Sequence, residues 1–101
     1  MERISIFAKR LKEARQAAGL SQKQLGINAK IDASSASARM NQYEKGTHTP
    51  NLLTVSNLAD ALKRPLVYFY CENDELAKLI LRFTALGQAE RKRLLDRLDE
   101  L

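Results

Sequence analysis

Apolar residues recur along this chain at the three- and four-residue spacing of amphipathic helices. The first such pattern predicts a helix from about Ile4 to Ala18. Gly19 follows it, and glycine is common just past a helix because it accepts positive φ. We expect Lys9, Arg10 and Lys12 to face water. The apolar stripe of this helix is Phe7, Leu11, Ala14 and Ala18.

A second helix is expected to begin after Ser21, whose hydroxyl can accept a free backbone N–H. Gln24, three residues later, completes a possible capping box. Gly26 lacks a Cβ and lets another helix cross closely, as two helices joined by a short turn require. Residues 28–34 are mostly polar apart from Ile31, which we expect to be buried beneath the turn.

A third helix is expected from Ser35 to about Glu44, with Ser34 or Ser35 as its cap. One side of it is apolar. The other is small and polar, lacks the Leu and Val that attract a protein helix, and carries Arg39 at one edge. Such a side can lie close against a flat polar surface. The apolar side is Ala36, Met40 and Tyr43, and the outer side is Ser35, Ala38 and Gln42.

Residues 47–50 are predicted to form a loop, because Pro50 favours extended backbone before it. A fourth helix is expected from Leu52 to Leu62. Pro65 suits the first position of a short fifth helix over Leu66 to Tyr70, and a strand is the alternative for that apolar run. The inward positions of the fourth helix are Leu52, Val55, Leu58, Ala59 and Leu62.

Two further amphipathic patterns complete the chain. Asn73 or Asp74 caps the first, and Gly87 separates it from a final helix over Gln88 to Leu101. The chain is therefore predicted to be all-α, with a five-helix domain at residues 1–71 and C-terminal amphipathic helices at 72–101. The apolar positions of the last two helices are Leu76, Leu79, Ile80, Phe83, Leu94, Leu95, Leu98 and Leu101.

The net charge of +5 is unevenly distributed. Residues 1–50 hold nine Lys and Arg against four Asp and Glu, whereas residues 51–101 hold eight of each. A basic half attracts nucleic acid, because phosphates release condensed counterions when Lys and Arg approach. Basic residues that only keep the surface soluble are the alternative. We interpret the third helix as a recognition helix that enters the major groove of DNA.

Several classes of function are disfavoured. Cys71 is the one cysteine and His48 the one histidine, so no zinc constellation or internal disulfide is expected. No catalytic partner for the histidine and no phosphate-binding glycine loop is evident, and we expect neither an enzyme nor a cofactor. The chain contains no run of about 18 apolar residues and no secretory signal, so we expect no membrane span and a cytoplasmic protein.

Six segments together carry a resemblance to a known family. They resemble, in order and spacing, the Xre family of Cro and lambda-repressor-like helix-turn-helix proteins over about residues 6 to 70. The segments are Phe7-Ala-Lys-Arg-Leu-Lys-Glu-Ala-Arg15, Gly19-Leu-Ser-Gln22, Leu25-Gly26, Met40-Asn-Gln-Tyr-Glu-Lys-Gly46, Pro50 and Leu58-Ala-Asp-Ala-Leu62.

The resemblance implies that the second helix crosses the DNA backbone, the third lies in the major groove, and homodimers read paired half-sites. Gln22 would then donate to a phosphate. Gln42 could pair with adenine, and Arg39 could reach guanine or a phosphate. The implied DNA contacts are Gln22, Lys23, Ser35, Ser37, Ala38, Arg39, Gln42, Lys45, Thr47 and His48.

Two features connect the third helix to its neighbours. Arg15 lies near the buried edge of the first helix and needs a carboxylate, for which Glu44 is the candidate, and the resemblance implies the same buried ion pair. Leu25 and Glu44 are nineteen positions apart, about four more than is usual in the family. Either the second helix extends or the turn becomes a loop.

Two interpretations of the C-terminal helices remain open. Leu94, Leu95, Leu98 and Leu101 could pack within the chain or form a dimer interface. The first function that we expect is a sequence-specific regulator, a repressor that binds a palindromic operator as a homodimer. The alternative is an antitoxin or adaptor that binds a protein partner through these helices.

Overall fold

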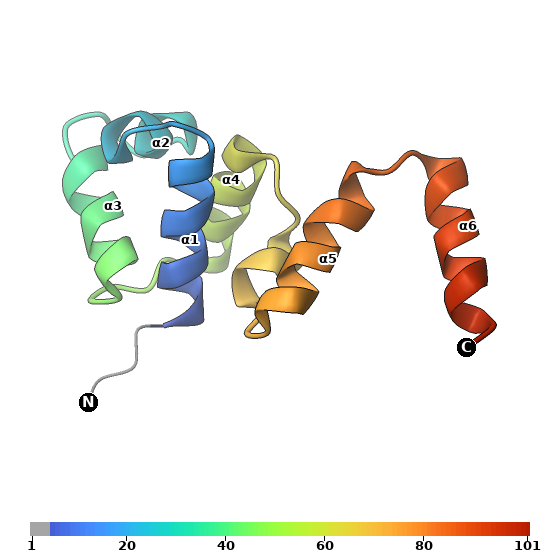
Figure 1. Ribbon diagram of the computed structural model, residues 1–101. Coiled ribbons are helices and arrows are strands. Elements are labelled where there is room, and N and C mark those ends of the chain that lie inside the picture. Colours follow the sequence, from blue (N-terminus) through green and yellow to red (C-terminus); the bar gives the residue numbers. More distant parts are fainter. Residues whose placement is uncertain (1–4) are drawn as a thin grey trace.

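The computed structural model describes residues 5–101 and contains, within them, helices but no strand (Figure 1). The all-α prediction is confirmed. The expected start of the first helix at Ile4 lies outside the described residues. The elements are α1 (Ile6–Ala17), α2 (Gln22–Asn28), α3 (Ala36–Lys45), α4 (Leu52–Leu62), the 3-10 helix η1 (Leu66–Tyr70), α5 (Asp74–Ala85) and α6 (Gln88–Asp99).

The elements α1 to η1 share one hydrophobic core, with α5 leading away from it and α6 standing apart at the far end (Figure 1). Tyr68 and Phe69 bring η1 into this core, and Ala77 is the one buried residue of α5. The arrangement places α3 on one flank of the domain and the C-terminal helices on the other. The largest fully buried side chains are Phe69, Leu11, Leu25, Met40, Leu58 and Val55.

Helix α1 begins after Ser5, whose Oγ accepts from the backbone N–H of Ala8 at 3.0 Å. Two expectations for it were wrong. Ala18 lies past the helix end and is exposed rather than packed. Arg10 does not face water: it is 3% exposed, because four hydrogen bonds satisfy its guanidinium inside the protein.

The connection between α2 and α3 is a seven-residue loop, residues 29–35, so α2 does not extend. Lys30 adopts the left-handed conformation, with φ of 70°, and the N–H of Ile31 donates to the carbonyl of Gly26 at 2.9 Å. These are the features of a helix stop that turns the chain inward. Ile31 is 8% exposed and lies in the core, as expected.

Gly26 allows α2 and α3 to pack closely, as its position in the sequence indicated. A Cβ at Gly26 would lie 2.8 Å from Cβ of Ala36 and 3.2 Å from its backbone. Ser21 Oγ accepts from the N–H of Gln24 at 3.0 Å, but the Gln24 amide donates to Asn28 instead of completing a capping box. The close contact between Gly26 and Ala36 therefore fixes how α2 and α3 pack against each other.

Two details of the next elements differ from expectation. Leu52 was expected to be inward but is 65% exposed, and Leu53 is 70% exposed, because the first turn of α4 lies beyond the edge of the core. Residues 66–70 form a 3-10 helix, so the strand alternative is wrong. Pro65 precedes this helix in extended conformation and does not occupy its first position.

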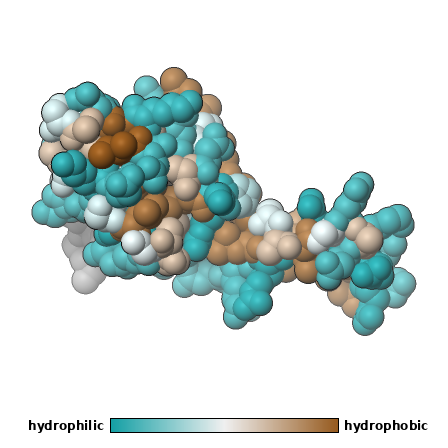
Figure 2. Space-filling model, turned by 90° about the horizontal axis from the view of Figure 1, so that it is seen from above, coloured by the Kyte–Doolittle hydropathy of each residue, from teal (hydrophilic) through white to brown (hydrophobic). Residues whose placement is uncertain are grey.

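Helices α5 and α6 expose most of their apolar residues. Leu76, Leu79, Leu95 and Leu98 are each about half exposed, and no residue of α6 is buried. Seen from above, hydrophobic residues continue along α5 toward α6 (Figure 2). Leu101 lies beyond the end of α6 and is almost fully exposed.

Candidate nucleic-acid interface

The outer side of α3 is free of contacts with the core and carries small and polar residues. Ser37, Ala38 and Arg39 are exposed, and Gln42 is partly exposed. Ala36, Met40 and Tyr43 are buried on the opposite side, as the apolar pattern predicted. A helix that is rigidly packed along one side can present the other to a groove without rearranging.

The orientation of α3 is fixed by an ion pair with α1. Arg15 Nε donates to Glu44 Oε2 at 2.5 Å and Nη2 donates to Oε1 at 3.0 Å. Both side chains are nearly excluded from water, with exposed fractions of 14% and 4%. The hydrogen bond to Glu44 raises the pKa of Arg15 above its usual value. Nη1 of Arg15 also donates to the carbonyl of Leu20 at 2.9 Å, which ties in the chain before α2.

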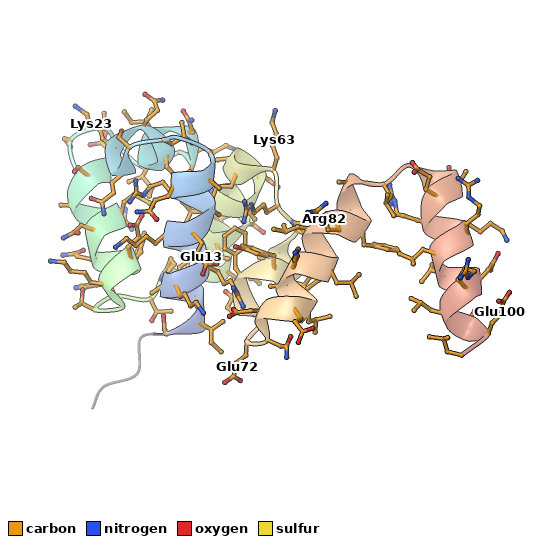
Figure 3. All side chains as sticks on the ribbon, viewed as in Figure 1. Glu13, Lys23, Lys63, Glu72, Arg82 and Glu100 are labelled. Atoms are coloured by element: carbon orange, nitrogen blue, oxygen red, sulfur yellow. The ribbon has the colours of Figure 1, made fainter. Side chains whose placement is uncertain are left out.

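Gln22 joins this group from the first turn of α2. Its Nε2 lies 3.3 Å from Glu44 Oε1 and 3.4 Å from Asn41 Oδ1. The side chain is therefore engaged by α3 in the free chain, and the phosphate contact that the resemblance implied for it stays a prediction. Lys23 beside it is exposed and points away from the body (Figure 3). Of these two residues, Lys23 has the more accessible polar group.

The C-terminal end of α3 carries Lys45 and leads into an exposed polar loop. Gly46 ends the helix in the left-handed conformation, with φ of 75°. Thr47 donates to the carbonyl of Gln42 through both its N–H, at 3.1 Å, and its Oγ1, at 3.2 Å, and the N–H of His48 lies 3.4 Å from the same oxygen. Lys45, Thr47 and His48 are all exposed, so the structure gathers them directly after the outer side of α3.

The first turn of α3 is held by the loop before it. Ser35 occupies the cap position, but its hydroxyl donates to the carbonyl of Asp32 at 3.3 Å and makes no cap hydrogen bond. The Asp32 carboxylate accepts from the backbone and hydroxyl of Ser34. Lys30 is exposed in the same loop, which brings a cation beside α2 and α3 that the resemblance did not include. In the sequence, the only indication of this additional cation was that the connection is longer than is usual in the family.

Arg39 lies at the edge of the outer side. Its Nη2 donates to the hydroxyl of Tyr43 at 3.0 Å, and the guanidinium lies 6.0 Å from the centre of that ring. This contact orients the guanidinium along the helix while leaving the residue exposed. The remaining predicted residues, Leu94, Leu95, Leu98 and Leu101, belong to the C-terminal helices and are not part of this interface.

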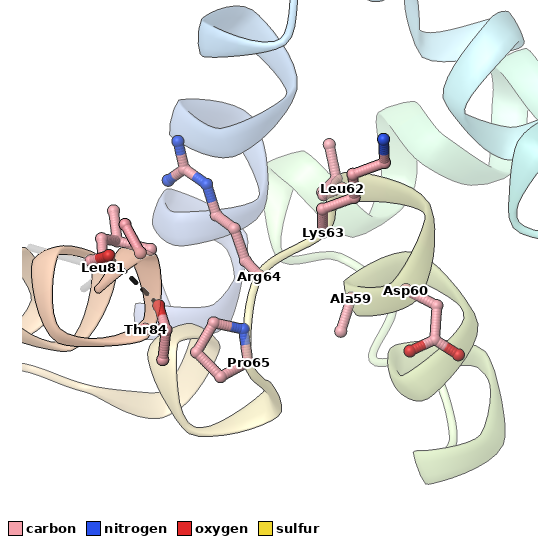
Figure 4. Close-up of a pocket in the computed structure, with 9 residues that line it drawn as sticks. Ala59, Asp60, Leu62, Lys63, Arg64, Pro65, Leu81 and Thr84 are labelled. Carbon is pink, nitrogen blue, oxygen red and sulfur yellow. Dashed lines mark hydrogen bonds between the residues drawn. The ribbon is translucent and has the colours of Figure 1, made fainter. Parts of the chain in front are cut away.

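A pocket of about 610 Å³ lies elsewhere, between the C-terminal end of α4, the connection to η1 and the end of α5 (Figure 4). Lys63 enters this connection in the left-handed conformation, with φ of 56°, and Thr84 Oγ1 donates to the carbonyl of Leu81 at 3.1 Å. No residue of α2 or α3 lines the pocket. It therefore does not belong to the surface described above.

Other kinds of site find no support in the part of the chain that the structure describes. Within residues 5–101, no group of three or more His, Cys, Asp or Glu side chains is placed to hold a metal ion. None of the helices that the structure describes is long and apolar enough to cross a lipid bilayer.

Comparison with known proteins links the chain to a regulator. No family model matches the sequence, and no curated protein matches it. The chain is, however, similar to a solved structure titled "Crystal structure of transcriptional regulator BswR", with a TM-score of 0.89 and 49% sequence identity. The match covers 93% of each chain, so both the helix-turn-helix part and the C-terminal helices are included. This chain therefore belongs to the same family as the transcriptional regulator BswR.

Proposed function

We propose that this chain is a sequence-specific DNA-binding transcriptional regulator of the Xre, Cro and lambda-repressor-like type. The observation that carries the proposal is the exposed small and polar side of α3, held against α1 by the buried pair of Arg15 and Glu44. Small residues let the helix approach base edges closely, and Gln42 can donate to and accept from adenine. Lys23, Lys45, Thr47 and His48 flank this side and can contact phosphates.

We further propose that the chain acts as a homodimer on a palindromic operator. The support is an apolar groove of about 390 Å³ between α5 and α6, which a second copy could fill. A monomer of this size rarely leaves so many leucines half exposed on neighbouring helices. Leu94, Leu95 and Leu98 are the α6 residues that line the groove. Repression would follow from occupancy of a promoter, with no catalytic step.

The experiment begins with selection of bound fragments from the source genome by the purified chain, followed by sequencing. Fluorescence anisotropy at one fixed salt concentration then compares the selected site with a shuffled duplex of equal length and composition. We expect a preference of at least about 10³-fold, as for other specific regulators. Equal affinity for the two duplexes would contradict base reading by α3.

The same groove also supports a second candidate, an antitoxin or adaptor that uses it for another protein. The two candidates differ in what the purified chain does alone. A self-sufficient regulator sediments as a homodimer at micromolar concentration and binds its operator without help. An adaptor stays monomeric until a partner from the native cell is added.

A further inference from the structure

Arg10 is buried at the junction between the helix-turn-helix domain and the C-terminal helices. Its Nε donates to the carbonyl of Cys71 at 2.9 Å, and Nη2 donates to the carbonyl of Glu72 at 3.3 Å and to Asp74 Oδ1 at 2.9 Å. Nη1 donates to Glu13 Oε2 at 3.1 Å. We refer to these five residues as the clasp. Burial lowers the pKa of Arg10, but the hydrogen bonds to Asp74 and Glu13 outweigh it and raise the pKa overall.

Neighbouring contacts hold the two carboxylates of the clasp in place. The Tyr68 hydroxyl donates to Glu13 Oε2 at 3.3 Å, and Lys9 Nζ lies 3.2 Å from Asp74 Oδ1. The side chain of Asn73 accepts from the N–H of Leu76 at 2.8 Å and so caps α5. The segment 71–74 is therefore fixed at both ends, to α1 by the guanidinium and to α5 by the cap. Glu72 marks this connection in Figure 3.

Apart from the clasp, helix α5 is held only by a short apolar contact with the core. Ala77, in its second turn, is the one residue of α5 that is buried, and Ile80 and Leu81 are only partly buried. Beyond them the helix runs away from the domain (Figure 1). Contacts over its first two turns, those of the clasp together with Ala77, Ile80 and Leu81, therefore decide the direction of the whole helix.

A small change of that direction matters at the far end. Helix α5 has 12 residues, and such a helix is about 18 Å long at about 1.5 Å per residue. A tilt of about 10° at the clasp moves its end by about 3 Å, which is close to the rise of about 3.4 Å per base pair. Paired recognition helices must lie about one helical turn of DNA apart. An error of one base-pair step is enough to misplace one of them.

An arginine is well suited to hold such a direction. A buried apolar residue can supply equal or greater stability than a buried charge, so stability alone does not call for arginine here. The planar guanidinium donates in fixed directions, and here it bonds four acceptors on two segments. The clasp thus restricts rotation as well as separation between α1 and α5.

We propose that Arg10 is a positioning residue that sets the half-site spacing read by the dimer, by fixing the direction in which α5 leaves the helix-turn-helix domain. This inference rests on the proposed function as a homodimer on paired half-sites. It adds a specificity determinant that lies outside the DNA interface.

The first test measures the direction of α5 without DNA. Spin labels are placed at two exposed positions, Gln16→Cys on α1 and Arg82→Cys on α5, while Cys71 is buried and does not compete for the label. Excess unlabelled chain ensures that only distances within one chain are recorded. We expect Arg10→Met and Asp74→Ala to shift or broaden the distance distribution, and Lys92→Ala on α6 to leave it unchanged. An unchanged distribution in both clasp variants overturns the proposal.

The second test measures spacing on DNA. Duplexes carry the selected half-sites at the native separation and at separations changed by one or two base pairs. We expect wild type to prefer one spacing by about 10-fold or more, because avidity is lost when geometry prevents both sites from engaging. In Arg10→Met and Asp74→Ala this preference should fall to about 3-fold or less, while affinity for a single half-site is unchanged.

The outcomes separate this inference from the function on which it rests. Asp74 is largely exposed, so Asp74→Ala provides a variant of the clasp that leaves the core intact if Arg10→Met does not fold. Equal loss at every spacing assigns Arg10 to stability alone and overturns the proposal. A sharp preference for one half-site spacing that persists in wild type and in both variants also overturns the proposal. If wild type shows no preference for any spacing, the proposed homodimer on paired half-sites is contradicted, and so is the role of Arg10 that rests on it.

Discussion

Arg15 on α1 and Glu44 on α3 form a two-point ion pair, with Nε 2.5 Å from Oε2 and Nη2 3.0 Å from Oε1. Glu44→Ala leaves the guanidinium without its carboxylate in a site that is mostly closed to water. We expect a loss of about 3–5 kcal/mol in the free energy of unfolding, the usual cost of breaking a buried pair. Urea denaturation at neutral pH, followed by circular dichroism, measures it.

The matched control for that prediction is an exposed pair on α6. Lys92 Nζ lies 3.1 Å from Asp96 Oδ2, and both side chains are more than half exposed. We expect Asp96→Ala to cost less than about 0.5 kcal/mol, because water screens such pairs. If Glu44→Ala and Asp96→Ala lost similar amounts of unfolding free energy, burial would not be what makes the Arg15–Glu44 pair stabilising.

Gly26→Ala tests the close approach of α2 and α3. The added methyl group would lie 2.8 Å from Cβ of Ala36, so one helix must move. We expect a loss of about 1–3 kcal/mol, as for other overpacked cores. Ala36→Gly alone also destabilises, but the double variant should lose less than the sum of the two, because the methyl groups no longer collide. Strict additivity in urea denaturation speaks against this contact.

Gln42→Ala tests base reading by α3. The loss should appear mainly on the operator, because only base contacts distinguish it from other DNA. We expect discrimination between operator and shuffled duplex to fall by about 1–3 kcal/mol in anisotropy titrations. Gln88→Ala on α6 is the control and should change neither affinity. An equal loss on both duplexes would remove Gln42 from the base-reading set.

Lys45→Ala tests the proposed phosphate contacts at the C-terminal end of α3. Its effect should be similar on every DNA sequence, because phosphates carry no sequence information. We expect weaker binding to both duplexes and a decrease of about one in the slope of log affinity against log salt concentration. Lys92→Ala, which removes the same charge from α6, should leave the slope unchanged. A slope that Lys45→Ala does not alter places this lysine outside the phosphate contacts.

Leu94→Lys combined with Leu98→Lys tests the homodimer. Both leucines line the groove between α5 and α6, and neither is buried in the single chain. We expect a folded monomer by sedimentation equilibrium, with half-site binding retained and operator affinity lost. Unfolding of the double variant would instead indicate that α6 packs within the chain. A dimer that persists would place the interface elsewhere.

Much of the fold follows from local sequence patterns. Apolar spacing predicted α1, α3, α4, α5 and α6 to within a few residues, because each of them carries its apolar residues along one side. Helix α2 was predicted from its cap at Ser21, and η1 from Pro65 and an apolar run for which a strand was the alternative. The exceptions lie at helix ends. Ala18 and Leu52 continue the apolar period of their helices but are exposed, because periodicity does not show where the neighbouring elements stop.

The least predictable residue was Arg10. Its position between Lys9 and Lys12 suggested a surface charge, whereas two of its acceptors are backbone carbonyls some sixty positions away. Every residue has a backbone carbonyl, so no sequence pattern can indicate which carbonyl will accept a hydrogen bond from Arg10. The pairing of Arg15 with Glu44 was easier to anticipate, since Arg15 lay near the buried edge of its helix and the family resemblance implied the same pair.

Helix α6 buries none of its residues within the chain, so in the proposed homodimer its stability would depend on the second copy. An isolated helix of about 12 residues is marginal in water, so a single chain gains little from keeping α6 formed. In the proposed homodimer, unpaired subunits should therefore be cut first in this segment by cellular proteases, and paired ones should survive. The amount of regulator in the cell would then respond more than proportionally to its rate of synthesis.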